Sequence, residues 1–222
     1  MVANQRRRPM RRLRETSRFQ ICHYGASFVF RILLLALAGS RPAFCSDELT
    51  VYELLAPESH AFAITYDMST SVEGSPYLFN PIRRGSEASD ERVIDAATGK
   101  ELKFETVSAT DAVAHGLKGK PNADSYLQVT LAHSVAKGGE ARVRIFKTYK
   151  DAASYGPDGG DLKFQRGFGI KRNVIVLPKG FELVACGAPG IVTTQSDGRV
   201  RVSFFNDRDD EMMVRLRGRR LP

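Results

Sequence analysis

The chain has 222 residues, of which 42% are hydrophobic, so it can build the core of one domain and is not a disordered polypeptide. Its formal net charge of +8 comes entirely from residues 1–45, which contain nine arginines, no lysine and one acid, Glu15. The remaining residues hold 24 basic and 24 acidic side chains, out of totals of 33 and 25. A nucleic-acid-binding domain concentrates basic side chains on its folded surface, so we exclude nucleic acid as a partner.

Residues 1–45 have the pattern of a signal peptide. An arginine-rich stretch, residues 6–18, is followed by an apolar core, residues 28–38, which is too short to cross a bilayer about 30 Å thick. Cleavage after Cys45 leaves Ser46 first and a mature chain with no stable membrane span. The sequence therefore predicts a periplasmic or secreted protein. An N-terminal anchor, a buried helix and a lipidated Cys45 are the alternatives.

Residues 46–222 are predicted to form a single all-β domain, an antiparallel β-sandwich of roughly ten or more short strands. The reason is a series of short β-branched and aromatic runs bounded by glycine and proline turns, with no long helical periodicity. The prediction also allows this domain to contain a C-terminal sub-lobe that starts near residue 165. In chain order, the expected strands are 49–55, 60–68, 77–82, 93–94, 102–106, 126–131, 141–149, 173–177, 181–186, 191–194, 200–205 and 212–216.

Several local predictions follow from these runs. Residues 92–107 are expected to form a hairpin across a turn at 95–100, and residues 126–131 and 141–149 a second pair across Lys137-Gly138-Gly139. The segments between the runs are predicted as loops, at residues 85–91, 109–124 and 151–161. In the run 60–68, alternate positions are apolar and are expected to share one buried face; they are Phe62, Ile64, Tyr66 and Met68.

Cysteine usage excludes an internal disulfide after cleavage, because Cys186 is then the remaining cysteine. It lies in the apolar run 181–186, which is typical of a small core residue and not of a nucleophile.

No catalytic or metal-binding motif is present. The mature chain has three histidines, His60, His115 and His133, far apart in sequence, and it lacks His-Glu-x-x-His, paired cysteines, Gly-x-Ser-x-Gly and a glycine-rich phosphate loop. The sequence therefore predicts no catalytic residue, no metal and no cofactor.

An acidic run lies between two expected strands and consists of Asp207, Asp209, Asp210 and Glu211. A solvated turn explains it better than a carboxylate pair for glycoside chemistry or a calcium loop. Arg215, Arg217 and Arg219 follow at alternate positions, so they share one strand face. We expect this face to be exposed and to pair with the acidic turn.

The region 149–173 combines aromatic and basic side chains around a glycine-containing loop. Such a combination suits a protein, peptide or glycan partner. The alternative is that the tyrosines and phenylalanines close the end of the sandwich as core residues. The candidate binding residues are Tyr149, Tyr155, Arg166, Phe168, Lys171 and Arg172.

Two segments carry a family resemblance: 169–183, Gly-Ile-Lys-Arg-Asn-Val-Ile-Val-Leu-Pro-Lys-Gly-Phe-Glu-Leu, and 197–204, Asp-Gly-Arg-Val-Arg-Val-Ser-Phe. They resemble uncharacterised exported bacterial β-sandwich proteins that are similar to the non-catalytic N-terminal domain of zinc aminopeptidases. They also look like the luminal part of ribophorin, an oligosaccharyltransferase subunit. The resemblance covers roughly residues 51–221. It implies a non-catalytic role, because the aminopeptidase domain carries no zinc ligands, and it assigns no functional residue here.

These observations favour an exported, non-catalytic binding or accessory module that is not an enzyme. A hydrolase whose active site is not visible in the sequence is the alternative, and a detached enzyme domain kept as a structural subunit is a third. Convergence of the three histidines, or two carboxylates in a cleft, favours the hydrolase. An exposed aromatic patch on a flat sheet favours binding.

Overall fold

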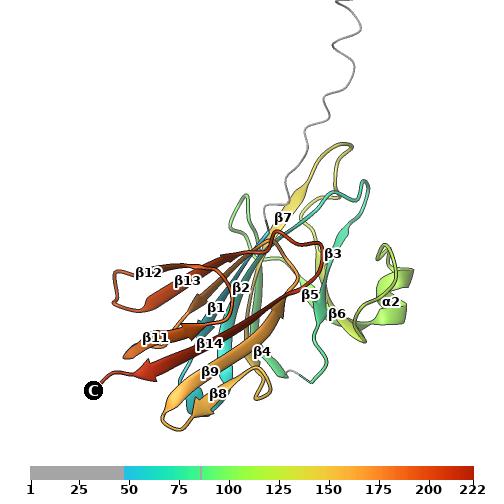
Figure 1. Cartoon of the computed structure of the whole chain (residues 1–222). Helices are drawn as coiled ribbons and strands as arrows, with labels where there is room; N and C mark the ends of the chain where they lie inside the picture. Colours follow the sequence, from blue (N-terminus) through green and yellow to red (C-terminus); the bar gives the residue numbers. More distant parts are fainter. Residues whose placement is uncertain (1–47, 86) are drawn as a thin grey trace, which may run out of the picture. The chain divides into compact units, whose positions relative to one another are not determined.

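A computed structural model describes residues 48–85 and 87–222, and it is all-β, as predicted (Figure 1). The predicted signal peptide, residues 1–45, lies outside the described residues. Within the described part, no helix is long and apolar enough to cross a membrane. The strands are β1 (Leu49–Leu54), β2 (Ala61–Thr70), β3 (Tyr77–Ile82), β4 (Glu87–Asp95), β5 (Phe104–Ser108), β6 (Ser125–Thr130), β7 (Ala141–Lys150), β8 (Tyr155–Asp158), β9 (Asp161–Phe168), β10 (Arg172–Val176), β11 (Phe181–Cys186), β12 (Ile191–Thr194), β13 (Val200–Phe205) and β14 (Met212–Arg220). A 3-10 turn, η1 (Pro57–Ser59), and one short helix, α2 (Ala109–Ala114), complete the described elements.

The strands form three sheets. The largest has seven strands in the order β12-β13-β10-β1-β2-β7-β4, the second has four in the order β11-β14-β9-β8, and the third has three in the order β3-β6-β5. The pairs are antiparallel except for β1 and β10, which run parallel. The strands after residue 165 join both the seven-stranded and the four-stranded sheet.

Period-two patterning explains which face of the large sheet is buried. On β2, Phe62 and Ile64 are buried and Tyr66 and Met68 are half-buried, which confirms the predicted shared face. Strand β7 pairs with β2 along ten residues and buries its alternate positions. Those positions are Val143, Ile145, Lys147 and Tyr149.

Two hydrophobic cores lie along this face. One packs aromatic side chains of the seven-stranded sheet, such as Tyr52 and Phe62, against β9 of the four-stranded sheet. The other packs β4 and β7 against the three-stranded sheet. Residues of one face of β7 belong to both cores, Tyr149 to the first and Ile145 to the second, and Tyr66 contacts both. The two smaller sheets therefore cover neighbouring stretches of the same face.

The first predicted hairpin forms only next to its turn, and the second is wrong. The bridge Ile94–Glu101 and the backbone hydrogen bonds from Asp95 to Lys100 and from Leu102 to Val93 join the two sides of the 95–100 turn. Beyond the turn, strand β4 pairs with β7 and β5 pairs with β6. Strand β6 pairs with β3 and β5, so it does not pair with β7. Local alternation indicates the buried face of a strand, but its partner is chosen by contacts distant in sequence.

Three predicted loops contain regular structure. Strand β4 already begins at Glu87, β8 lies at Tyr155–Asp158, and α2 forms at Ala109–Ala114. The helix has an N-cap, because the Ser108 hydroxyl accepts a hydrogen bond from the Asp111 amide at 3.1 Å.

The basic face of β14 is exposed as predicted, but it does not pair with the acidic turn. Arg215 donates to Gln165, Arg217 lies 3.5 Å from Asp158, and Arg219 pairs with Glu182. These partners belong to strands β9, β8 and β11 of the same four-stranded sheet. Cys186 is half-buried and packs against the first core, as expected for a small core residue.

Candidate functional site

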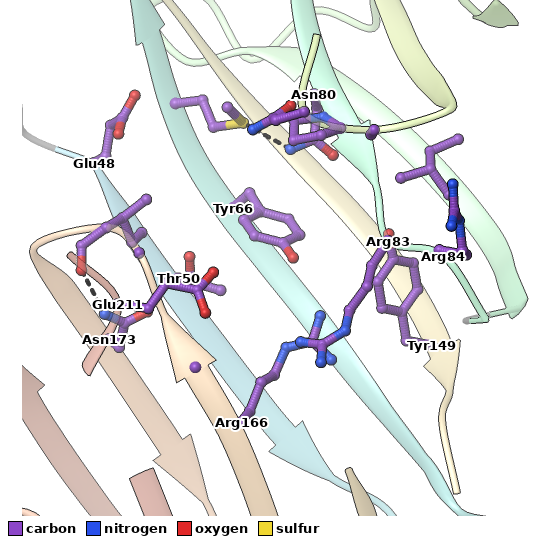
Figure 2. Close-up of a pocket in the computed structure, with 18 of the residues that line it drawn as sticks. Glu48, Thr50, Tyr66, Asn80, Arg83, Arg84, Tyr149, Arg166, Asn173 and Glu211 are labelled. Carbon is purple, nitrogen blue, oxygen red and sulfur yellow. Dashed lines mark hydrogen bonds between the residues drawn. The ribbon is translucent and has the colours of Figure 1, made fainter. Parts of the chain in front are cut away.

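A cleft of about 720 Å³ opens between the two smaller sheets and is lined by residues of all three sheets (Figure 2). Tyr52 on β1 and Tyr66 on β2 lie along it, Asn80 on β3 borders one side, and Arg166 on β9 borders the other. Its volume is that of a typical small-ligand site. Strands β2 and β7 extend along both hydrophobic cores. The cleft lies over the stretch of their inward face between the two cores.

A buried ion pair supports one wall of the cleft. The Arg166 Nη1 donates to the Asp151 Oδ2 at 3.1 Å, and the side chains are 6% and 7% exposed. The Arg166 guanidinium also lies against the rings of Tyr52, Phe62 and Tyr149, with its carbon 5.5–5.8 Å from each ring centre. These contacts hold the guanidinium in place while it still borders the cleft.

Tyrosine hydroxyls supply further donors. Burial raises the pKa of Tyr52, Tyr66 and Tyr149, and the Arg166 charge only partly opposes this effect. Their hydroxyls therefore stay protonated at neutral pH. The Tyr149 hydroxyl is buried and lies against the Arg83 backbone, which partly opposes the rise in its pKa.

An unpaired polar atom belongs to Asn173 on β10. Its Nδ2 donates to the Ile170 carbonyl at 2.8 Å, whereas its buried Oδ1 accepts no hydrogen bond from residues 48–85 or 87–222. An unpaired buried polar group costs about 1–3 kcal/mol. Asn173 lines the cleft, but its side chain is buried, so contacts to a bound molecule come from the more exposed charged groups around it.

Lys147 lies next to the cleft with 2% exposure. Its Nζ donates to the Asn80 Oδ1 at 2.7 Å and lies 5.2 Å and 4.9 Å from the ring centres of Tyr66 and Tyr149. Burial lowers its pKa to about 8; the Glu91 charge opposes this shift and the Arg166 charge adds to it. A buried cation thus increases the positive potential on this side of the cleft.

Charges at the rim are separated by sign. Figure 2 shows Glu48 and Glu211 on one side of the cleft and Arg83, Arg84 and Arg166 on the other. Arg84 is neutralised by Asp124, which accepts two hydrogen bonds of 2.8 Å from it. The Glu211 carboxylate lies over the backbone of Gly167, where a Cβ atom would meet it at 2.2 Å.

The structure brings only part of the predicted binding set to the cleft. Tyr149 and Arg166 line it, whereas Tyr155 and Phe168 are buried in the first core, the alternative considered for the aromatics. Lys171 donates to the Arg208 carbonyl at 2.7 Å, and Arg172 donates to the Glu48 carbonyl at 3.3 Å.

Sequence reasoning missed Arg83, Asn173 and Lys147, and it assigned Glu211 to a solvated acidic turn. Lys147 has a signal in the sequence, because it interrupts the apolar alternation Val143, Ile145, Tyr149 at an inward position. Arg83 and Asn173 are polar residues in a loop or at a strand end, and nothing in their local pattern distinguishes them.

The three histidines have separate partners. The His60 Nδ1 lies 3.0 Å from the Tyr155 carbonyl, and the His115 Nδ1 lies 2.7 Å from the Gln128 Oε1. His133 lies near Asp95 and lowers the pKa of that carboxylate slightly, after the larger effect of Thr98. Within the described ranges, no group of three His, Cys, Asp or Glu side chains is placed to hold a metal ion.

The fold and the cleft define an all-β sandwich domain with a polar, charged ligand-sized cleft. No protein-family model matches the chain, and no curated protein matches it. Similar solved structures include an M1 zinc metallopeptidase from Deinococcus radiodurans (TM-score 0.47, 10% identity, 77% of this chain and 41% of that chain). Another is an aminopeptidase N family protein from Idiomarina loihiensis (TM-score 0.45, 12% identity, 77% and 29%). This chain thus spans less than half of either protein. The similarity is too low to support any functional argument, and the resemblance to ribophorin stays a prediction.

Proposed function

We propose that this domain is an exported, non-catalytic binding or accessory module, and that its protein, peptide or glycan ligand occupies the cleft. One observation carries this proposal: a cleft of about 720 Å³ is lined by polar and charged side chains of all three sheets, with Glu48 and Glu211 on one side and Arg83 and Arg166 on the other. A concave site of this volume with a few convergent polar groups is typical of a ligand-binding site.

Filling the cleft is expected to abolish partner binding. Ile170 lines the cleft with a half-buried side chain, so Ile170→Trp places an indole where the ligand lies. When the protein is captured from the periplasm of a Gram-negative host, we expect the amount of each stoichiometric partner to fall at least about tenfold in this variant. Quantitative mass spectrometry of the captured material measures this change.

Two matched substitutions make the test specific. Val113→Trp alters an exposed aliphatic residue on α2 and should leave the partner in place. Ile191→Trp alters the exposed edge strand β12, where Ile191 is 71% exposed. If Ile191→Trp loses the partner and Ile170→Trp keeps it, the binding surface is the β12 edge and not the cleft. Thermal unfolding checks that all three variants fold.

Export is tested by the N-terminus of the captured protein. We expect intact-mass measurement to give a chain that begins at Ser46, because the small residues Ala43 and Cys45 suit the −3 and −1 positions of a cleavage site. A chain that keeps residues 1–45 would contradict the signal peptide, and a Cys45 that carries lipid would support the lipoprotein alternative.

A hydrolase is the second candidate, because two carboxylates, Glu48 and Glu211, line the cleft. Neither is buried: Glu48 is half-buried and Glu211 is exposed. Paired catalytic carboxylates usually lie in contrasting environments, one of them apolar. Turnover of a bound peptide or glycan, lost in Glu211→Gln, would establish this candidate; recovery of the intact ligand supports the binding module.

A further inference from the structure

We propose that the cleft binds a peptide through a carboxylate held by Arg83 and Arg166, with Glu48 and Glu211 facing the peptide's ammonium or other basic groups. This inference rests on the proposed function, because it names the ligand class of the same cleft. It selects a peptide over a glycan from the arrangement of charges and donors around the cleft.

Two guanidinium groups converge at one side of the cleft. Figure 2 shows the Arg83 side chain extending towards Arg166. Both charges act on the same hydroxyl, since each lowers the pKa of Tyr52 against the larger effect of burial. Like charges on the same side of the cleft repel each other, so an anion bound there is favoured.

The carboxylates of the domain leave this positive charge incompletely neutralised. Asp151 pairs with Arg166, and Glu91 acts on Lys147. For Arg83, no ion pair is found within the described ranges. A bound anion would supply the missing negative charge.

The available donors suit a carboxylate. A guanidinium has five N–H donors in a planar fork, and Asp151 accepts a hydrogen bond from only one nitrogen of Arg166, Nη1. Tyr52, whose hydroxyl is protonated, lines the same cleft. Two carboxylate oxygens therefore have donors from two arginines and a nearby tyrosine.

The opposite side of the cleft distinguishes a peptide from a more highly charged anion. Glu48 and Glu211 would repel a phosphate dianion lying in the same cleft, whereas they attract the ammonium groups of a peptide. A neutral glycan would leave both charged sides unpaired. A peptide that carries one carboxylate and one ammonium group is complementary to both sides.

Affinity selection with random tetrapeptide pools tests this inference. One pool has free C-termini, a second is the same pool with C-terminal amides, and a third is amidated and lacks Asp and Glu. We expect immobilised protein to retain the free-acid pool at least about tenfold better than the third pool, the loss expected for a charge-assisted hydrogen bond. Retention of the second pool through peptides rich in Asp or Glu would identify a side-chain carboxylate as the source.

Arg83→Ala is the decisive variant, because Arg83 is exposed and its truncation is expected to leave the fold intact. It should lower retention of the free acids about tenfold, whereas Arg219→Ala, which removes an exposed arginine paired with Glu182 on β11, should leave it unchanged. Equal retention of all three pools, unaffected by Arg83→Ala, would overturn carboxylate recognition but not the binding module. Retention of no pool while a partner is still lost in Ile170→Trp would overturn the peptide and keep the proposed function. If no pool is retained and Ile170→Trp does not lower partner capture, both the peptide ligand and the proposed function are overturned.

Discussion

Replacing Asp151 with Asn is expected to destabilise the domain by about 3–5 kcal/mol, because it leaves the buried Arg166 charge without its counter-ion. Asp151 also accepts hydrogen bonds from the Ser154 amide and hydroxyl at 3.1 Å and 2.6 Å. An amide in place of the carboxylate directs a donor group at Arg166 or at Ser154. Urea unfolding followed by tyrosine fluorescence measures the loss, since the chain contains no tryptophan.

A double substitution separates the lost charge pair from the lost hydrogen bonds. Arg166→Met removes the charge and places an apolar side chain against the rings of Tyr52, Phe62 and Tyr149. We expect Asp151→Asn combined with Arg166→Met to be more stable than Asp151→Asn alone by about 2 kcal/mol. If the free energy of unfolding of Asp151→Asn lies within about 1 kcal/mol of that of the unmodified protein, the buried Arg166 charge does not depend on this carboxylate.

The same ion pair shows what the sequence can reveal about the cleft. Arg166 was a candidate because it lies between Phe164 and Phe168, yet the aromatic residues around it form the core and only the guanidinium borders the cleft. Alternation along β9 accounts for this, since its inward positions are all buried. The alternation identifies the inward residues of β9. It does not show which of them borders the cleft between the two smaller sheets.

Strand pairing shows a similar division between what was and was not predictable. The inward face of β2 follows from Phe62 and Ile64 at period two, and the pairing of β2 with β7 depends on residues some 80 positions apart. The cleft depends on that distant pairing, because its residues come from strands β1, β2, β3, β7, β9 and β10 and from the loops near their ends. Arg83 and Glu211 join the site only after these sheets have packed, so the acidic run that contains Glu211 does not show that it lies opposite Arg83.

Lys147 should make the stability of the domain depend on pH in an unusual direction. Burial lowers its pKa to about 8, against about 10.4 in an unfolded chain. Between these values the unfolded state binds more protons than the folded state, so the free energy of unfolding rises with pH. We expect an increase of about 2 kcal/mol between about pH 7.5 and pH 9.5. The buried tyrosines, whose pKa values are raised, reverse this trend only above about pH 10.

Lys147→Met should remove this rise, because methionine fills a similar volume without a titrating group. Its absolute stability also reflects the loss of the hydrogen bond to Asn80, so the slope with pH is the informative quantity. Lys163→Met, at an exposed position on β9, is the matched control and should keep the slope of the unmodified protein. Urea unfolding at several pH values measures all three proteins. If Lys147→Met and Lys163→Met show the same slope, the Lys147 amine is not desolvated, and the positive potential that it adds beside the cleft is smaller than its burial implies.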